Sequence, residues 1–301
     1  MKHPPLIVAM IIMTSGMGVA AGNAQAVDAA AAPTLEQIKD AKVRGIYDSK
    51  VIDLENGVYD GAPFVSGGAS RPRVELMVRL TAAGDLDGAS GEDRVVFLVE
   101  SSGAAGANIF LGVFRMQGGQ VENTGTVLVG NRVQLRRLDI DKSTIVLDVL
   151  EAGQVDPMCC PTRLARKFYQ MVQGGLKQIA SEVTGTLSLA AIADVEWTLE
   201  EWNGQPLAPG SQTPTFTVAG GTAGGFGGCN RYSGAVKESA PGKISLGELA
   251  STQMACADAR MSLEGGFLED LKSVTTYAFL EGRLALRWQD GGRNGLLLFR
   301  R

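Results

Sequence analysis

The sequence predicts a mainly β protein of the α+β class, built from two β-rich domains. The first observation is a stretch from about residue 45 to 150 in which apolar residues mostly recur with a period of two, between clusters rich in Gly, Asp and Asn. The second is a further series of short strand patterns over 190–301. The third is a single convincing amphipathic helix, predicted over about 259–274.

The N-terminal elements follow from local patterns. Thr34 is a predicted N-cap for a brief helix over 34–44, with Glu36 in its first turn. Residues 74–80 alternate after their first step, as expected of a half-buried strand. Residues 95–99 and 109–114 are fuller apolar runs, which predict strands buried on both faces.

The chain divides into an N-terminal domain over 34–173, a linker over 174–189 and a second domain over 190–301. The linker prediction rests on Gly175 and Gly185, which act as breakers. Residues 162–172 fit either a short helix or a strand. In the second domain Asp258 is the predicted helix cap, and the strand patterns cover 195–202, 215–219, 231–237, 243–246, 275–280, 283–288 and 295–300.

Residues 1–26 have the features of a secretory signal peptide. Lys2 precedes a short apolar run, and Ala24-Gln25-Ala26 forms a small-residue cleavage site. The apolar run is shorter than the ~20 residues of a membrane span. We therefore expect a periplasmic or secreted protein after cleavage near Ala26, with a flexible leader over 27–33 and no membrane span in the mature chain.

Composition excludes several classes of function. The chain has 28 basic and 32 acidic residues, which leaves no basic excess for nucleic acid. Its single histidine is His3, within the predicted signal peptide. The mature chain therefore has no Ser-His-Asp or Cys-His machinery and no histidine metal ligand. We expect no enzyme activity and no catalytic residues.

The acidic loop of residues 84–93 has two interpretations. Asp85, Asp87 and Asp93 are spaced as oxygen ligands of a short calcium loop, although Ala89 replaces one usual acid. The alternative is a turn whose Asp side chains cap backbone amides. A carboxylate-dependent hydrolase using Asp85, Asp87 and Glu92 is a third hypothesis, but it needs two acids facing each other across a cleft.

The second domain contains segments that resemble a known family. They are WTL at 197–199, GGFGGCNRYSG at 224–234, STQMAC at 251–256, then Met261, Glu264 and Phe267, and LAL at 284–286. In this order they resemble the META domain of HslJ-like heat-shock proteins. The resemblance implies a small twisted or barrel-like antiparallel sheet with one packed helix. It also implies an envelope or stress-tolerance role without an established enzyme activity.

Further expectations depend on this resemblance. It favours a Cys229–Cys256 disulfide, because both residues lie in its characteristic segments, and leaves Cys159 and Cys160 as a vicinal pair. That pair is either a redox-sensitive or ligand-facing turn or a structural clip, unless one of the two cysteines is paired elsewhere. The glycines before Cys229 indicate a tight bend, or an anion cradle. Residues 56–59, 67–70, 84–88 and 156–161 also resemble a secreted domain found alongside META units.

Three hypotheses of function result. The first is an exported, non-catalytic envelope protein with a structural, stress-protective or binding role, whose partner is an unknown envelope protein or a small ligand. Its candidate ligand surface is Trp197, Trp202, Asn230 and Tyr232. The second is a calcium-stabilised secreted binding module, with calcium as the sole candidate cofactor. The third is the carboxylate hydrolase.

Overall fold

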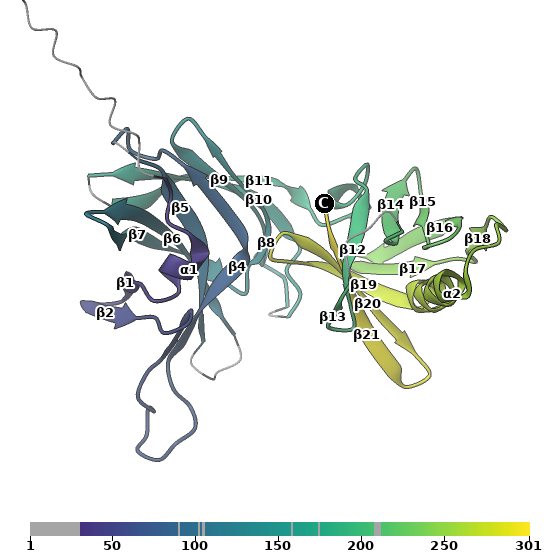
Figure 1. The fold of residues 1–301 in the computed structure, drawn as a ribbon, viewed down its shortest axis with the longest axis horizontal. Coiled ribbons are helices and arrows are strands. Elements are labelled where there is room, and N and C mark those ends of the chain that lie inside the picture. The colour runs from purple at the N-terminus through teal and green to yellow at the C-terminus, as the bar shows by residue number, and fades with distance from the viewer. Residues whose placement is uncertain are drawn as a thin grey trace, which may run out of the picture.

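A computed structural model describes residues 31–301, except 90, 102, 104–105, 158, 174 and 208–211. The predicted signal peptide and most of the predicted leader lie outside the described residues. Figure 1 shows two β-rich bodies, the N-terminal one in purple to teal and the C-terminal one in green to yellow. The prediction of a mainly β protein is confirmed.

The N-terminal domain contains two large antiparallel sheets whose strands follow chain order, and a small two-stranded sheet. The first sheet consists of β3 (Val58–Asp60), β4 (Arg73–Gly84), β5 (Asp93–Ser101), β6 (Asn108–Gln117) and β7 (Gln120–Asn131). The second consists of β8 (Gln134–Asp141), β9 (Thr144–Glu151), β10 (Arg163–Val172) and β11 (Gly175–Thr186). Short connections between neighbouring strands favour this up-and-down order.

The five-stranded sheet is covered on both faces. Val95 and Phe97 of β5 pack into the core between the two sheets, whereas Val96 and Leu98 pack into a second core on the opposite face. The second core is completed by α1 (Leu35–Ile38), β1 (Lys42–Tyr47) and β2 (Lys50–Asp53). Alternate side chains of one strand therefore enter different cores, as predicted for the full apolar runs.

The predicted helix at 34–44 is wrong in length. The Thr34 side chain accepts from the Gln37 backbone N–H at 3.3 Å, and Gln37 Oε1 accepts from the Thr34 backbone at 2.8 Å. This capping box starts a helix of only four residues. The chain then enters β1, because Val43 is completely buried against the sheet.

The predicted linker at 174–189 is also wrong over most of its length. Residues Gly175–Thr186 form β11, which pairs with β10 from Val172↔Gly175 to Arg163↔Thr186. The segment 162–172, for which a helix and a strand were both open, is strand β10. A 3₁₀ turn at Leu189–Ala191 then leads into the second domain.

The C-terminal domain is a closed antiparallel barrel of eight strands. Closure results from pairing of the first strand with the last, including Leu199↔Phe299 and Trp202↔Leu297. The barrel strands are β12 (Trp197–Trp202), β14 (Thr215–Ala219), β15 (Thr222–Phe226), β16 (Arg231–Ala240), β17 (Lys243–Leu246), β19 (Val274–Leu280), β20 (Arg283–Asp290) and β21 (Arg293–Arg300). Two short strands, β13 (Gln205–Pro206) and β18 (Ala250–Ser251), pair with β12 and β16.

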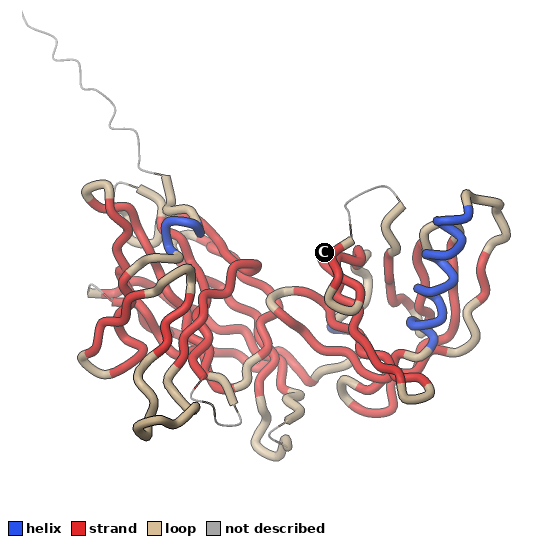
Figure 2. Tube along the Cα trace, turned by 60° about the horizontal axis from the view of Figure 1, so that its bottom comes forward, coloured by secondary structure: helices blue, strands red, loops and turns tan. Residues whose placement is uncertain are grey.

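The helix α2 (Asp258–Lys272) lies beside the barrel strands (Figure 2). Its N-cap is Ala257, without a side-chain cap, so the prediction that Asp258 caps it is wrong; Asp258 is the first helical residue. Phe267 and Leu271 are completely buried in the barrel core. The Phe267 ring is surrounded by aromatic neighbours at centroid distances of 5.9–6.4 Å, namely Tyr232, Trp202 and Phe299.

The β19–β20 hairpin contacts strand β8 of the N-terminal domain. The Gly282 N–H donates to the Leu135 carbonyl at 3.0 Å, and the Phe279 N–H donates to Gln134 Oε1 at 2.8 Å. Arg79 adds ion pairs to Glu200 and Glu201 across the same boundary. Backbone and charged contacts therefore join the two domains. Of the residues that the structure describes, none lies in a helix long and apolar enough to cross a bilayer.

Candidate functional site

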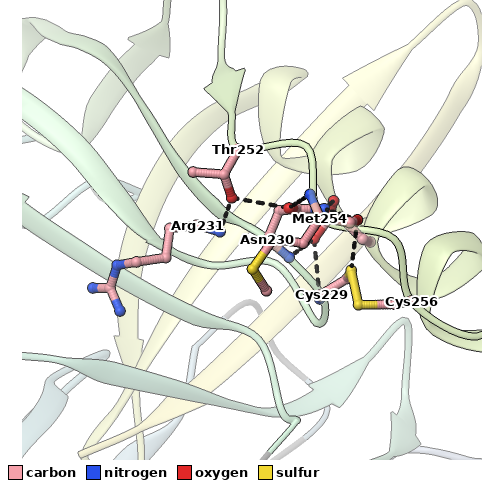
Figure 3. Close-up of a disulfide and its surroundings, with 7 residues drawn as sticks. Cys229, Asn230, Arg231, Thr252, Met254 and Cys256 are labelled. Carbon is pink, nitrogen blue, oxygen red and sulfur yellow. Dashed lines mark hydrogen bonds between the residues drawn. A yellow bond between two sulfur atoms is a disulfide. The ribbon is translucent and has the colours of Figure 1, made fainter.

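The second domain contains a disulfide-linked loop cluster at the end of the barrel nearest the start of α2. Cys229, just before β16, is bonded to Cys256, just before α2, with their Cα atoms 6.1 Å apart. The structure thus contains the expected pairing. Figure 3 shows this bond with Asn230 and Thr252 turned towards each other and the Arg231 side chain directed away.

The bend before Cys229 depends on two glycines. The Gly227 N–H donates to the Asn230 carbonyl at 2.7 Å, which closes the turn. A Cβ on Gly227 would lie 2.9 Å from Glu264 Oε2, and Gly228 has a φ of +122°. The predicted bend therefore occupies 227–228, whereas 222–226, also rich in glycine, is strand β15.

Asn230 connects two loops that are distant in the sequence. Its Oδ1 accepts from Thr252 Oγ1 at 2.9 Å and from the Met254 N–H at 2.7 Å, and its Nδ2 donates to Glu264 Oε1 at 2.9 Å. Only 3% of Asn230 is exposed. The amide thus fixes the 252–254 segment against the start of β16, beside the disulfide.

Glu264 is the buried acceptor at the centre of this cluster. Its Oε2 accepts from the Cys229 N–H at 3.0 Å and, at a shorter separation, from the Asn230 N–H. Glu264 is only 6% exposed, and a carboxylate is tolerated there because N–H donors surround it. The sequence signalled this position only through the family resemblance, since a glutamate on a helix is ordinarily expected to face solvent.

The cluster consists of the segments on which the resemblance depends. The family model of the META domain matches residues 190–301. Residues 190–301 therefore match the META domain, and we refer to this segment as the META domain. The predicted boundaries of the resemblance are confirmed.

Comparison with other proteins adds little beyond this match. No curated protein matches the chain. One solved structure, described as an NMR structure of a protein, is 23% identical and covers 38% of this chain and 94% of its own, with a TM-score of 0.32. Another, an NMR structure of a protein from Burkholderia xenovorans, is 26% identical and covers 42% of this chain and 97% of its own, with a TM-score of 0.31.

The four residues of the predicted ligand surface do not form an exposed surface in the META domain. Trp197, Asn230 and Tyr232 are buried, and Trp202 is half-buried. The Tyr232 hydroxyl donates to the Thr215 carbonyl at 2.7 Å, and burial raises the pKa of this phenol above its ordinary range. Trp197 Nε1 donates to the Ile192 carbonyl at 3.1 Å. Their polar atoms donate hydrogen bonds within the domain, because the aromatic rings pack inside the barrel.

The structure brings Asp85, Asp87 and Asp93 together. One carboxylate oxygen from each lies within 4.8 Å of the others. Arg115 from β6 also reaches this cluster, with Nη2 2.7 Å from Asp87 and 2.9 Å from Asp93. The guanidinium is a cation that the loop sequence does not reveal, because Arg115 lies 22 residues beyond Asp93.

The acidic loop also contains the bonds of Asx turns, and Asp93 Oδ2 accepts from the Leu86 N–H at 3.1 Å. Asp85 Oδ1 accepts from the Gly88 N–H at 2.7 Å, and Asp87 Oδ1 accepts from the Ala89 N–H at 2.9 Å. Burial acts to raise the pKa of Asp87, but the Ala89 N–H and Arg115 outweigh it and lower the pKa. Burial raises the pKa of Asp93 despite its bonds to Arg115. The geometry contains the features of both interpretations, a carboxylate cluster and a capped turn.

A charged groove of about 290 Å³ lies on the outer face of β8, β9 and β10. Two of its three acids are paired with arginines: Asp148 contacts Arg166 at 2.7 Å, and Asp139 contacts Arg137. A carboxylate held by a guanidinium is a poor general acid. The groove therefore gives no support to the hydrolase hypothesis.

The second disulfide joins Cys159 and Cys160 in the loop between β9 and β10. Both residues are exposed. The stems of this loop are held by Asp156, whose carboxylate accepts from the Gly153 N–H and the Thr162 N–H, each at 2.7 Å. The vicinal pair therefore lies beyond a fixed loop base.

Proposed function

We propose that this chain is an exported, non-catalytic envelope protein with a structural, stress-protective or binding role. The proposal rests on one observation: the characteristic META residues make bonds within the domain. Cys229 is bonded to Cys256, Asn230 joins two loops, and Glu264 accepts hydrogen bonds from the backbone. These residues stabilise the domain, so the function resides in the surface that the fold presents.

The composition of the barrel core supports the absence of catalysis. Phe267, Tyr232 and Phe299 fill the space beneath α2. Residues 27–301 contain no histidine. A substrate in the barrel would have to displace aromatic packing, which costs several kcal/mol.

Two disulfides support export. Disulfides persist in oxidising compartments such as the periplasm and the extracellular space. The predicted cleavage site after Ala26 agrees with this location. The unknown partner is then another envelope protein or a small ligand that lies on the same side of the inner membrane as the exported protein.

Expression of the full chain in a bacterial host tests export. We expect release by osmotic shock, a mature N-terminus at Val27 and no free thiols. A cytoplasmic product with an intact N-terminus and free thiols would contradict the proposal.

Complementation of a deletion strain under envelope stress tests the absence of catalysis. We expect Asp85→Ala, Asp87→Ala and Glu92→Ala variants to complement as well as the wild type does when their levels match. Loss of protection by a variant that keeps the wild-type level and melting temperature would instead support the hydrolase hypothesis.

Calcium binding at Asp85, Asp87 and Asp93 is a second candidate function, favoured by the convergence of their carboxylates. Calcium at 100 times its dissociation constant would add ~2.7 kcal/mol of stability, or a shift of several degrees in the melting temperature. The shift should disappear in Asp87→Ala. If millimolar calcium produces no shift against a chelator, the loop is a turn neutralised by Arg115.

A further inference from the structure

The disulfide in the loop between β9 and β10 is exposed to solvent and is not buried in any of the hydrophobic cores. Cys159 and Cys160 are both exposed, and Val155 in the same loop is 94% exposed. Neither cysteine belongs to any of the three hydrophobic cores. A thiol can therefore reach the sulfur atoms without opening a domain.

The loop base does not depend on this disulfide. Asp156 accepts from the backbone of Gly153 and from both the backbone and the hydroxyl of Thr162, whose Oγ1 lies 2.9 Å from Asp156 Oδ1. The Leu187 N–H donates to the Thr162 carbonyl at 2.7 Å and ties the same stem to the end of β11. Because these bonds lie outside the pair, the stems are held in either redox state.

The Cys229–Cys256 disulfide of the META domain, in contrast, lies in a buried environment. Cys229 is 2% exposed, and its backbone N–H is bonded to the buried carboxylate of Glu264. The sequence separation is 27 residues for this bond and 1 for the vicinal bond. Closure of a long loop stabilises a fold through the unfolded chain, whereas closure between neighbours contributes little. Reduction of the two bonds therefore has very different consequences for folding.

We propose that Cys159–Cys160 is a site of reversible thiol–disulfide exchange, whose co-reactant is a dithiol. One thiolate of the dithiol attacks Sγ of either cysteine, the Cys159–Cys160 bond breaks, and the other sulfur leaves as a thiolate. The second thiol of the co-reactant then attacks the mixed disulfide. Two electrons pass to the protein, both cysteines take up protons, and the dithiol becomes a disulfide.

Dithiothreitol is the probe for the first test, used on the folded mature protein at graded ratios of reduced to oxidised reagent. Free thiols are alkylated after each equilibration and identified by peptide mapping. We expect Cys159 and Cys160 to be alkylated together at a ratio about 100-fold lower than that needed for Cys229 and Cys256, since only the latter bond closes a long loop. Alkylation of all four cysteines at one ratio, or persistence of the vicinal bond after Cys229 has reacted, would overturn the proposal.

A second test examines the attack step. Cys159→Ser leaves a single thiol at Cys160, which should form a mixed disulfide with oxidised glutathione while the melting temperature stays at the wild-type value. The matched control is the Cys159→Ser/Cys160→Ser double variant, which should acquire no glutathione. A folded single variant whose thiol remains unmodified would show that the sulfur is not accessible, which also overturns the proposal.

Discussion

Glu264 offers the most direct test of what stabilises the META domain. Its carboxylate serves three donors: the Cys229 N–H, the Asn230 N–H and Asn230 Nδ2. Glu264→Ala leaves all three without their acceptor in a region where Asn230 is 3% exposed. Each stranded donor costs about 1–3 kcal/mol, and water entering the vacated space reduces the total, so we expect a loss of about 3–5 kcal/mol.

Urea unfolding followed by tryptophan fluorescence measures this loss in the right domain. The chain has three tryptophans, Trp197, Trp202 and Trp288, and all lie in the META domain. For a slope of about 1.3 kcal/mol per molar urea, the midpoint should fall by about 2–4 M. Glu264→Gln should fall between the wild type and the alanine variant, because it keeps one acceptor oxygen.

Glu269→Ala is the matched control on the same helix. Its side chain is 61% exposed and pairs with Arg293, so its removal should change stability by no more than about 0.5 kcal/mol. The two alanine substitutions share any change in helix propensity. If Glu264→Ala unfolds at the same urea concentration as Glu269→Ala, the buried carboxylate does not stabilise the cluster.

Three further predictions concern the disulfide, the tyrosines and the buried ion pair. Cys229→Ser should destabilise the META domain by about 2–4 kcal/mol in thermal melts, and an unchanged curve would contradict this. Burial raises the phenol pKa of four tyrosines, in one case to about 12. The stability that these neutral phenols contribute should be fully present below about pH 10 and should decline as the pH rises through the raised pKa values. An absorbance titration with parallel thermal melts measures this decline. The four tyrosines are Tyr47, with the pKa of about 12, and Tyr169, Tyr232 and Tyr277. Arg115→Ala removes the charged partner of Asp93, which has no exposed surface and keeps only the bond from the Leu86 N–H. The change should cost the N-terminal domain about 3–5 kcal/mol in denaturant unfolding followed by circular dichroism. Arg137→Ala, on an exposed pair, should cost little.

Strands with a strong burial pattern could be predicted from the sequence. Strand β11 could not, because it lacks such a pattern. β5 reads as an apolar run because alternate residues enter two cores. In β11, residues 177–184 are all exposed, so no period of two appears. Its position comes from pairing with β10, a tertiary effect that overrides the glycines at its ends.

Glycines misled the prediction of β15 for a steric reason. A Cβ on Gly225 would lie 2.2 Å from the Thr215 carbonyl oxygen of β14, and one on Gly224 would lie 3.0 Å from the Tyr232 carbonyl oxygen of β16. These glycines permit close approach of neighbouring strands rather than a turn. Local sequence cannot separate the two uses, because the contacting backbones lie elsewhere in the chain.

The candidate site was predicted in part. The resemblance led to Cys229 and Cys256, and the spacing of the acids led to the Asp85, Asp87 and Asp93 cluster. The sequence could not show that Trp197 and Tyr232 lie inside the barrel, because an aromatic residue has the same pattern at the mouth and in the core. It also could not place Arg115 among the aspartates, since that contact depends on the register of β5 and β6.

Closure of the barrel between β12 and β21 has a consequence for biogenesis. The strands of the N-terminal domain are complete by Thr186, so this domain can fold while later residues are still being synthesised. The META barrel must wait for Leu297 and Phe299, the partners of Trp202 and Leu199. During that interval the edge of β12 has no β21 to pair with, and the aromatic core residues remain in contact with water. Chaperone demand during biogenesis should therefore be greatest for about the last hundred residues, rather than evenly spread along the chain.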